Sequence, residues 1–238
     1  MAKISKQALK LHNKAMDLVH SDKVLSWDER RFILENYQEG ATQMNGLAGA
    51  FFTPAMLARD AMIEVNPDRS VLDLCAGIGG LSFWLYDNDI TCVELNHEYF
   101  EVGKRVVPNA NWIRGDALEY CDNTNDRFDF CISNPPFGNI NTSGYKGRYT
   151  GAEFEYKVIE AASKVSEFGV FIIPQMSAGF KYSGVRSFCD KDQSNKYLKF
   201  TEQTGIRLEP GCGVDTSIYL SEWHGVSPMV EIATAEFY

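Results

Sequence analysis

Residues 70–80 read SVLDLCAGIGG, an apolar strand pattern that runs directly into a glycine-rich turn. The first five residues predict a buried strand, and Gly77, Gly79 and Gly80 follow it closely. Glycines at such a position let the backbone turn tightly and approach a ligand. A lone Gly-x-Gly also occurs in many ordinary turns, so the surrounding sequence has to supply further evidence.

Strand and helix patterns alternate from this turn to residue 174. The helix patterns are GGLSFWLY (79–86), HEYFEVGKRV (97–106) and GAEFEYKVIEAASKV (151–165), and the strand patterns are ITCVEL, NWIRG, FDFCIS and GVFIIP. Regular alternation with short connections predicts an α/β fold with a doubly wound, mostly parallel sheet. Ligands of such sheets bind at the carboxyl ends of the strands. The remainder predicts a helix near 194–204 and the β-rich segments TGIRLEP, TSIYLSE and MVEIATAEF.

The first fifty residues predict helices rather than strands. SWDE at 26–29 has capping-box spacing, and a helical apolar pattern follows it. A loop, GLAGAFFTP, then leads into a helix from about Pro54, with proline at a first-turn position. We therefore expect an N-terminal helical extension at 1–50 and a main domain at 51–238.

Composition places the chain among ordinary globular proteins. Its 238 residues are 45% hydrophobic and 23% charged, and no apolar run reaches the length of a membrane span. The N-terminus has no signal-peptide apolar block, so we expect a cytoplasmic protein without a membrane partner. Six dispersed cysteines form no CxxC pair and the four histidines are scattered, which predicts reduced thiols and no metal site.

The net charge of −9 argues against broad non-specific binding to nucleic acid, but the charge is unevenly distributed. Residues 62–130 carry 5 Lys/Arg against 13 Asp/Glu, a balance of −8. Residues 1–31 carry 7 against 4 and residues 181–199 carry 5 against 2, each a balance of +3. Residues 138–151 contain two basic residues and no acid. These basic segments are either solvated faces or contacts for an anionic partner.

Acidic residues follow successive strands in a pattern typical of nucleoside cofactors. Asp73 ends the first strand, and Glu94 ends the second, 21 residues later, where a carboxylate can accept both ribose hydroxyls. Asp116 follows the third strand, where it could accept from an adenine amino group, cap the next helix, or do both. Nicotinamide dinucleotides and S-adenosylmethionine both fit this pattern.

The segment FDFCISNPPFG at 128–138 separates these two cofactors. Two prolines cannot donate to a sheet ladder, so the strand must end at Asn134. An exocyclic amino group on a nucleobase is a poor nucleophile until acceptors draw its hydrogens away from the ring plane. Asn134 offers a side-chain carbonyl, Pro135 a main-chain carbonyl held by the proline Pro136 after it, and Phe137 a face for base stacking. This acceptor clamp suits an in-line methyl transfer governed by positioning.

These motifs together resemble the class I S-adenosylmethionine-dependent DNA N6-adenine methyltransferases, in the γ-like motif order: AGAFFTP, DLCAGIGG, then NPPF. The resemblance covers roughly residues 45–175 and implies a Rossmann-like, seven-stranded sheet and S-adenosyl-L-methionine as cofactor. It implies catalytic roles for Asn134, Pro135, Pro136 and Phe137. The cofactor contacts it implies are Phe52, Thr53, Asp73, Ala76, Gly77, Gly79, Glu94, Asp116, Ala117 and Asn134. The glycine loop is also similar to that of DNA cytosine-5 methyltransferases, but the chain has no Pro-Cys pair to supply their nucleophile.

The chain departs from the resembled family in one respect. Only 64 residues follow Pro174, too few for a large target-recognition domain. Sequence specificity is therefore expected to be short, relaxed, or supplied by a partner protein. Two segments mix aromatic and basic residues as a nucleic-acid groove would, and their candidate substrate contacts are Tyr145, Lys146, Arg148, Lys181 and Arg186.

Duplex DNA is the expected partner, with three alternatives. Ribosomal RNA adenine-N6 or guanine-N2 methyltransferases and protein glutamine methyltransferases resemble this motif set as well. A catalytically inactive binding or anti-restriction protein on the same fold is the third. The sequence leaves the target site and the oligomeric state open.

Overall fold

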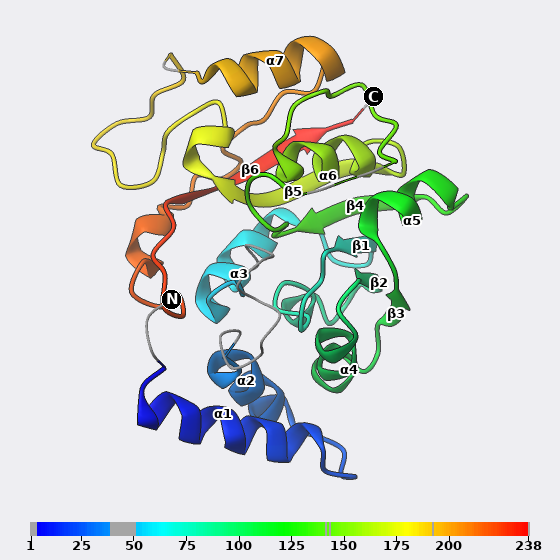
Figure 1. The fold of residues 1–238 in the computed structure, drawn as a ribbon, viewed down its shortest axis with the longest axis vertical. Coiled ribbons are helices and arrows are strands. Elements are labelled where there is room, and N and C mark those ends of the chain that lie inside the picture. Colours follow the sequence, from blue (N-terminus) through cyan, green and yellow to red (C-terminus); the bar gives the residue numbers. More distant parts are fainter. Residues whose placement is uncertain (1–3, 39–50, 141, 143, 192, 238) are drawn as a thin grey trace.

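The structure is a computed structural model that describes residues 4–38, 51–140, 142, 144–191 and 193–237 (Figure 1). Within these residues a single six-stranded sheet has the order β3-β2-β1-β4-β5-β6. Its strands are β1 (Ser70–Leu74), β2 (Asp89–Glu94), β3 (Asn111–Arg114), β4 (Phe128–Ser133), β5 (Ser166–Pro174) and β6 (Val230–Glu236). The first five strands run parallel and β6 runs antiparallel to β5. The predicted α/β class with a mostly parallel sheet is confirmed.

The sheet has six strands among the described residues, where the sequence predicted seven. The β-rich segment TGIRLEP contributes only a bridge, in which the Glu209 N–H donates to the Thr234 carbonyl at 2.9 Å and the reverse bond measures 2.8 Å. Pro210 follows without an N–H to donate, and Gly211 has a φ of +55°. Pairing therefore ends after one residue pair.

Two further predicted elements are shorter or different in kind. The predicted helix at 79–86 is reduced to the 3₁₀ turn η3 (Ser82–Trp84), because Gly79 and Gly80 each cost about 1 kcal/mol in a helix. TSIYLSE, predicted to be β-rich, forms the 3₁₀ helix η5 (Thr216–Tyr219). Asp215 caps η5 by accepting from the Ser217 N–H.

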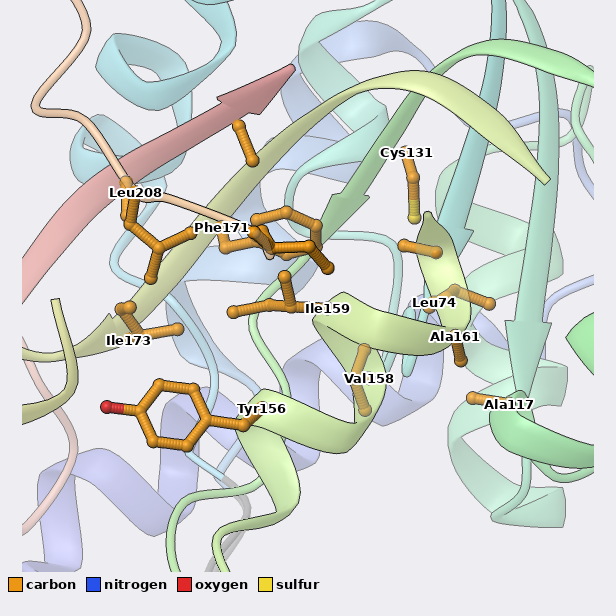
Figure 2. Close-up of a cluster of buried hydrophobic side chains, with 14 of the residues drawn as sticks. Leu74, Ala117, Cys131, Tyr156, Val158, Ile159, Ala161, Phe171, Ile173 and Leu208 are labelled. Atoms are coloured by element: carbon orange, nitrogen blue, oxygen red, sulfur yellow. The ribbon is translucent and has the colours of Figure 1, made fainter. Parts of the chain in front are cut away.

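Helices cover both faces of the sheet and bury its central strands. On one face, Leu72 and Leu74 of β1 belong to a cluster with side chains of α5 (Ala117–Asn123) and α6 (Phe154–Ala162), part of which Figure 2 shows. On the other face, Val71 packs in a cluster with α3 (Ala55–Ala61). This burial on both faces accounts for the nearly continuous apolar character of β1, β4 and β5.

The N-terminal helices α1 (Lys6–Val19) and α2 (Trp27–Asn36) lie at the far end of the molecule from α7 (Asn195–Thr204) (Figure 1). They pack on α4 (His97–Val106), where the Arg105 guanidinium donates to the carbonyls of Ser21 and Lys23 at 2.8 and 2.7 Å. The predicted capping box at Ser26 and Glu29 is confirmed. The predicted domain boundary at residue 50 and the start of the GLAGAFFTP loop lie outside the described residues.

Two short 3₁₀ turns, η2 (Met62–Glu64) and η4 (Gln175–Ser177), follow α3 and β5. No helix in the described part of the chain is long and apolar enough to cross a membrane.

Candidate active site

A cavity of about 480 Å³ lies at the carboxyl ends of β1 to β4. Such sheets bind ligands at this edge, and the cavity brings together residues from motifs far apart in the sequence. Ten of the predicted site residues line it: Phe52, Thr53, Asp73, Ala76, Gly77, Glu94, Asp116, Ala117, Asn134 and Pro136. Gly79, Pro135 and Phe137 are not among its lining residues.

The turn after β1 has the close backbone approach that its glycines predict. Cys75, Gly77 and Gly79 all have positive φ, at +58°, +57° and +84°. A Cβ on Gly77 would lie 3.1 Å from the ring of Phe52, so the tight contact and the positive φ together favour glycine at this wall of the cavity. A Cβ on Gly79 would instead lie 2.7 Å from Val107, which gives that glycine a packing role.

The carboxylate of Glu94 is buried and accepts two backbone bonds. The Gly77 N–H donates to Oε2 and the Asn96 N–H to Oε1, both at 2.7 Å. Burial raises the pKa of Glu94, and these hydrogen bonds oppose the rise. A carboxylate offers about four lone-pair positions, so Glu94 keeps capacity for two more donors. This is what binding a ribose diol requires.

Two other predicted acids already have partners of their own. Asp73 accepts from the Ser82 hydroxyl at 2.6 Å, and burial raises its pKa to about 7. Asp116 caps α5 by accepting from the N–H groups of Leu118 and Glu119 at 2.9 and 3.0 Å. Both of those bonds use Oδ1, so a cap and a ligand contact through Oδ2 can coexist.

The cavity also exposes one thiol, that of Cys75. Burial is the main cause that raises its pKa, and the nearby Glu94 carboxylate adds to it. Cys75 therefore stays a neutral thiol at neutral pH, and a thiolate nucleophile is not available there.

Asn134 has one half of its amide engaged and the other half free. Its Nδ2 donates to the Phe51 carbonyl and to Thr53 Oγ1, both at 2.8 Å. The Phe51 carbonyl can only accept, so the amide must turn its nitrogen toward that segment. Asn134 Oδ1 is buried and has no hydrogen-bond partner among the described residues. The FFTP segment thus fixes an unsatisfied acceptor at the cavity wall.

The remainder of the NPPF motif surrounds this acceptor. Pro135 is buried, and Pro136 lines the cavity. The ring of Phe137 is partly exposed and lies 6.4 Å from the ring of Phe51. The rings of Phe51 and Phe137 therefore form an aromatic pair next to Asn134, where the chain leaves β4.

The loop after NPPF is fastened to α6 by a buried carboxylate. Glu160 accepts from the Tyr145 hydroxyl, from the Arg148 N–H at 2.6 Å and from the Tyr149 N–H at 2.9 Å. Although burial acts to raise it, these bonds lower the pKa of Glu160. Tyr145 thus has a structural partner, and the exposed side chain of Arg148 also lies 3.5 Å from the Glu160 carboxylate, while Lys146 is exposed. Asn141 and Ser143 lie outside the described residues.

The other predicted substrate residues lie on the chain between β5 and α7. Lys181 is partly buried and its backbone pairs with that of Cys189. Arg186 is exposed. Neither residue lines the cavity.

Several cavity residues carry no motif that the sequence alone would single out. They include Leu34 of α2, Tyr99 of α4, Ile140, Thr142 and Phe154. Their apolar or neutral side chains look like ordinary core positions in the sequence, and only the packing of distant segments brings them to the cavity. Among the described residues, no group of three His, Cys, Asp or Glu could hold a metal ion.

Comparison with known proteins agrees with this arrangement. Residues 53–148 match the family described as Methyltransferase small domain. No curated protein matches the chain at a significant level.

Solved structures share the fold at low sequence identity. A modification subunit of a proposed type I restriction enzyme from Vibrio vulnificus has a TM-score of 0.59 and 14% identity, over 90% of this chain and 50% of that one. A proposed RNA methyltransferase from Pyrococcus horikoshii has a TM-score of 0.53 and 17% identity, over 98% and 99%. A proposed class I S-adenosylmethionine-dependent methyltransferase from Listeria monocytogenes has a TM-score of 0.56 and 13% identity, over 98% and 81%. The chain thus spans about half the length of the restriction-enzyme subunit.

The predicted cofactor is supported by the family match, and the predicted fold by the solved structures. The matched segment contains several residues that line the cavity, among them Gly77, Glu94, Asp116 and Asn134. Together these findings support a class I S-adenosylmethionine-dependent methyltransferase.

Proposed function

We propose that the chain transfers a methyl group from S-adenosylmethionine to the N6 amino group of adenine in DNA. The observation that carries this proposal is the free Oδ1 of Asn134, a buried acceptor at the cavity wall with no partner among the described residues. A buried acceptor left unpaired costs about 1–3 kcal/mol, so a ligand that donates to it recovers that free energy. An exocyclic amino group is such a donor.

The cavity residues fit the cofactor in three respects. Glu94 keeps lone pairs for two ribose hydroxyls, and Asp116 Oδ2 remains for an adenine amino group. Gly77 leaves room where a Cβ would meet Phe52. Phe52 and Thr53 would hold the methionine end, together with Asp73. When bound, the cofactor supplies an electrophilic methyl group on a sulfonium.

The chain's own residues would then activate the amino group. Asn134 Oδ1 and the Pro135 carbonyl accept its two hydrogens, so that the nitrogen lone pair leaves conjugation with the ring and points at the methyl group. Phe137 stacks on the extruded base, a contact worth about 1–3 kcal/mol in comparable sites. Both acceptors take hydrogen bonds and neither takes up a proton in the transfer step, which is governed by positioning. The methylated nitrogen would be cationic and would then release one proton to water.

RNA is the second candidate substrate. The similar structure from Pyrococcus horikoshii is that of a proposed RNA methyltransferase, and the alignment covers 98% of this chain and 99% of that protein. A nucleobase in RNA presents the same amino group to the same acceptors. The FFTP segment, which orients Asn134, favours DNA by resemblance.

We expect residues 1–50 to form a helical extension of the methyltransferase domain at 51–238. This extension would contribute to the active site, because Leu34 of α2 lines the cavity. We expect a short or relaxed target sequence, or a partner protein that supplies specificity. Affinity for duplex DNA should be modest, because the −8 block at 62–130 repels phosphate.

Methyl transfer from labelled cofactor to duplex DNA, ribosomal RNA and protein, measured in parallel, tests the proposal. N6-methyladenine in DNA is the expected product. Label only in RNA or in protein glutamine would reassign the substrate, and no label in any of the three would indicate an inactive binding protein.

A further inference from the structure

The chain between β5 and α7 forms a finger, defined here as residues 181–189. The Lys181 N–H donates to the Cys189 carbonyl at 2.7 Å and the reverse bond measures 3.0 Å, so the two ends of the finger are paired. Residues 184–188 between them are all exposed. In Figure 1 this yellow segment projects outward from the body of the molecule.

A buried carboxylate holds the base of the finger. Glu231 of β6 is 1% exposed and accepts from the N–H groups of Tyr182 and Ser183 at 2.9 and 3.0 Å. Its second oxygen accepts from the Ser183 hydroxyl at 2.7 Å, and the Gly184 N–H donates to Asp215 at 3.0 Å. The finger is therefore fixed at its base by several bonds to the body of the protein.

Between its paired ends the finger carries apolar and cationic side chains. Phe188 is 49% exposed and Val185 is 40% exposed, and Arg186 lies between them in the sequence. Phe188 directly precedes the paired Cys189, and its ring centroid lies 6.2 Å from that of Phe180. The finger itself carries two cations, Lys181 and Arg186, and no acidic residue, in a chain of net charge −9. An aromatic ring among cations fits nucleic acid, whose phosphates attract the cations and whose bases stack on the ring.

The finger lies on the same edge of the sheet as the acceptor clamp. Both segments leave the carboxyl ends of neighbouring strands, β4 for NPPF and β5 for the finger. One buried residue of α6 joins them: Glu155 accepts from the Gly138 N–H at 3.1 Å and from the Ser177 hydroxyl at 2.8 Å. A duplex bound over the clamp would thus meet the finger as well.

We infer that Phe188 is a wedge that enters the base stack of duplex DNA when the target base leaves it. This rests on the proposed function. Flipping a base out costs a few kcal/mol because its stacking and pairing are lost. An apolar side chain inserted between base steps stabilises the opened duplex, and the exposed Arg186 would contact a flanking phosphate.

The test measures kcat/KM for methyl transfer to three DNA substrates of one sequence. The target adenine is paired in the first, lies opposite an abasic site in the second, and is single-stranded in the third. Opening costs least where the base is unpaired or single-stranded. We expect Phe188→Ala to lose about tenfold or more on the paired duplex, less on the abasic duplex, and little on the single strand.

Two further variants separate a wedge from a structural role. Phe188→Trp keeps a large aromatic ring and should retain most of the activity on the paired duplex. Tyr86→Ala removes a ring that is 80% exposed in the turn before β2, at the opposite edge of the sheet, and should leave all three substrates unaffected. Fluorescence of 2-aminopurine at the target position reports base opening independently of methyl transfer.

Equal losses by Phe188→Ala on all three substrates, or no loss on the paired duplex, would overturn the wedge while leaving the proposed function intact. Absence of methylation of any DNA by the unaltered protein would overturn the proposed function and the wedge with it.

Discussion

Replacing Asn134 with alanine is the sharpest test of the acceptor clamp. The change removes Oδ1, the acceptor that we propose for the target amino group. It also removes Nδ2, whose bonds to the Phe51 carbonyl and Thr53 Oγ1 both measure 2.8 Å. The variant should therefore lose activity and some stability, by amounts that can be worked out separately.

The catalytic loss follows from the removal of one preorganised polar group. Such a loss typically lowers kcat by about 10²–10³, which corresponds to about 3–4 kcal/mol. The two lost hydrogen bonds are worth about 0.5–1.5 kcal/mol each, or about 2 kcal/mol in total, and removal of the unpaired Oδ1 offsets part of that loss. In a domain of this size Tm should therefore fall by at most about 4–8 °C. At an assay temperature well below Tm the variant would be folded, so the loss of rate would still be measured in full.

Single-turnover methyl transfer measures the catalytic loss, and thermal unfolding measures the stability loss. Calorimetry with S-adenosylmethionine measures cofactor affinity. We expect a rate at least about a hundredfold lower, with cofactor affinity changed by no more than about threefold. Asn123→Ala is the matched control, because that exposed amide at the end of α5 bonds only to the Glu119 carbonyl among the described residues.

A wild-type rate in the Asn134→Ala enzyme would show that the clamp mechanism is wrong. A loss of cofactor binding as large as the loss of rate would instead place Asn134 in the cofactor site and leave the amino group without its proposed acceptor.

Three further predictions address the cofactor, the buried acid and the DNA contacts. Glu94→Ala should weaken S-adenosylmethionine binding about tenfold or more in calorimetry, because hydrogen bonds to a charged group contribute about 1.5–3 kcal/mol; unchanged affinity would contradict the ribose role. Burial raises the pKa of Asp73 to about 7 from 3.8, so the folded state binds more protons between these pH values. The free energy of unfolding should therefore fall as pH rises from about 4 to 7, by about 4 kcal/mol at most, and Asp73→Asn should remove that part of the slope in denaturant titrations; an identical slope in the variant would refute the assignment. Replacing both Lys146 and Arg148 with alanine should raise the KM for DNA without changing cofactor affinity. The slope of log KM against log salt concentration should decrease by at most about two, one for each lost phosphate contact. Arg127→Ala, an exposed cation at the amino edge of the sheet, should change neither, and an equal effect there would indicate general rather than local charge.

Local signals predicted the elements that depend on neighbouring residues. The helix at 97–106 was predicted with the bounds that the structure has, because Asn96 caps it and its apolar residues recur at helical spacing. The predicted helix at 79–86 is wrong because Gly79 and Gly80 disfavour a helix, and the apolar residues there pack in a compact turn whose Ser82 bonds to Asp73. A periodic pattern cannot distinguish a helix from a turn that packs the same side chains inward.

The buried carboxylates show where sequence patterns stop being informative. Glu155 and Glu160 lie on α6 and Glu231 on β6, and each is at most 2% exposed. Charged residues in a sequence predict a solvated face. Here each carboxylate is satisfied by backbone N–H groups or hydroxyls of segments that return to it, and Glu231 also accepts from the Gln175 amide, 56 residues away in the chain. No local pattern records those partners.

Local sequence patterns suffice to predict strand β1, the glycine turn after it, the order of Asp73, Glu94 and Asp116 at successive strand ends, and the end of β4 at the two prolines. Each of these depends on backbone geometry within a few residues, where periodicity, capping and the missing N–H of proline act. Which half of the Asn134 amide is free follows only from the folded arrangement. That choice depends on the Phe51 carbonyl, 83 residues earlier, which can accept a hydrogen bond but cannot donate one.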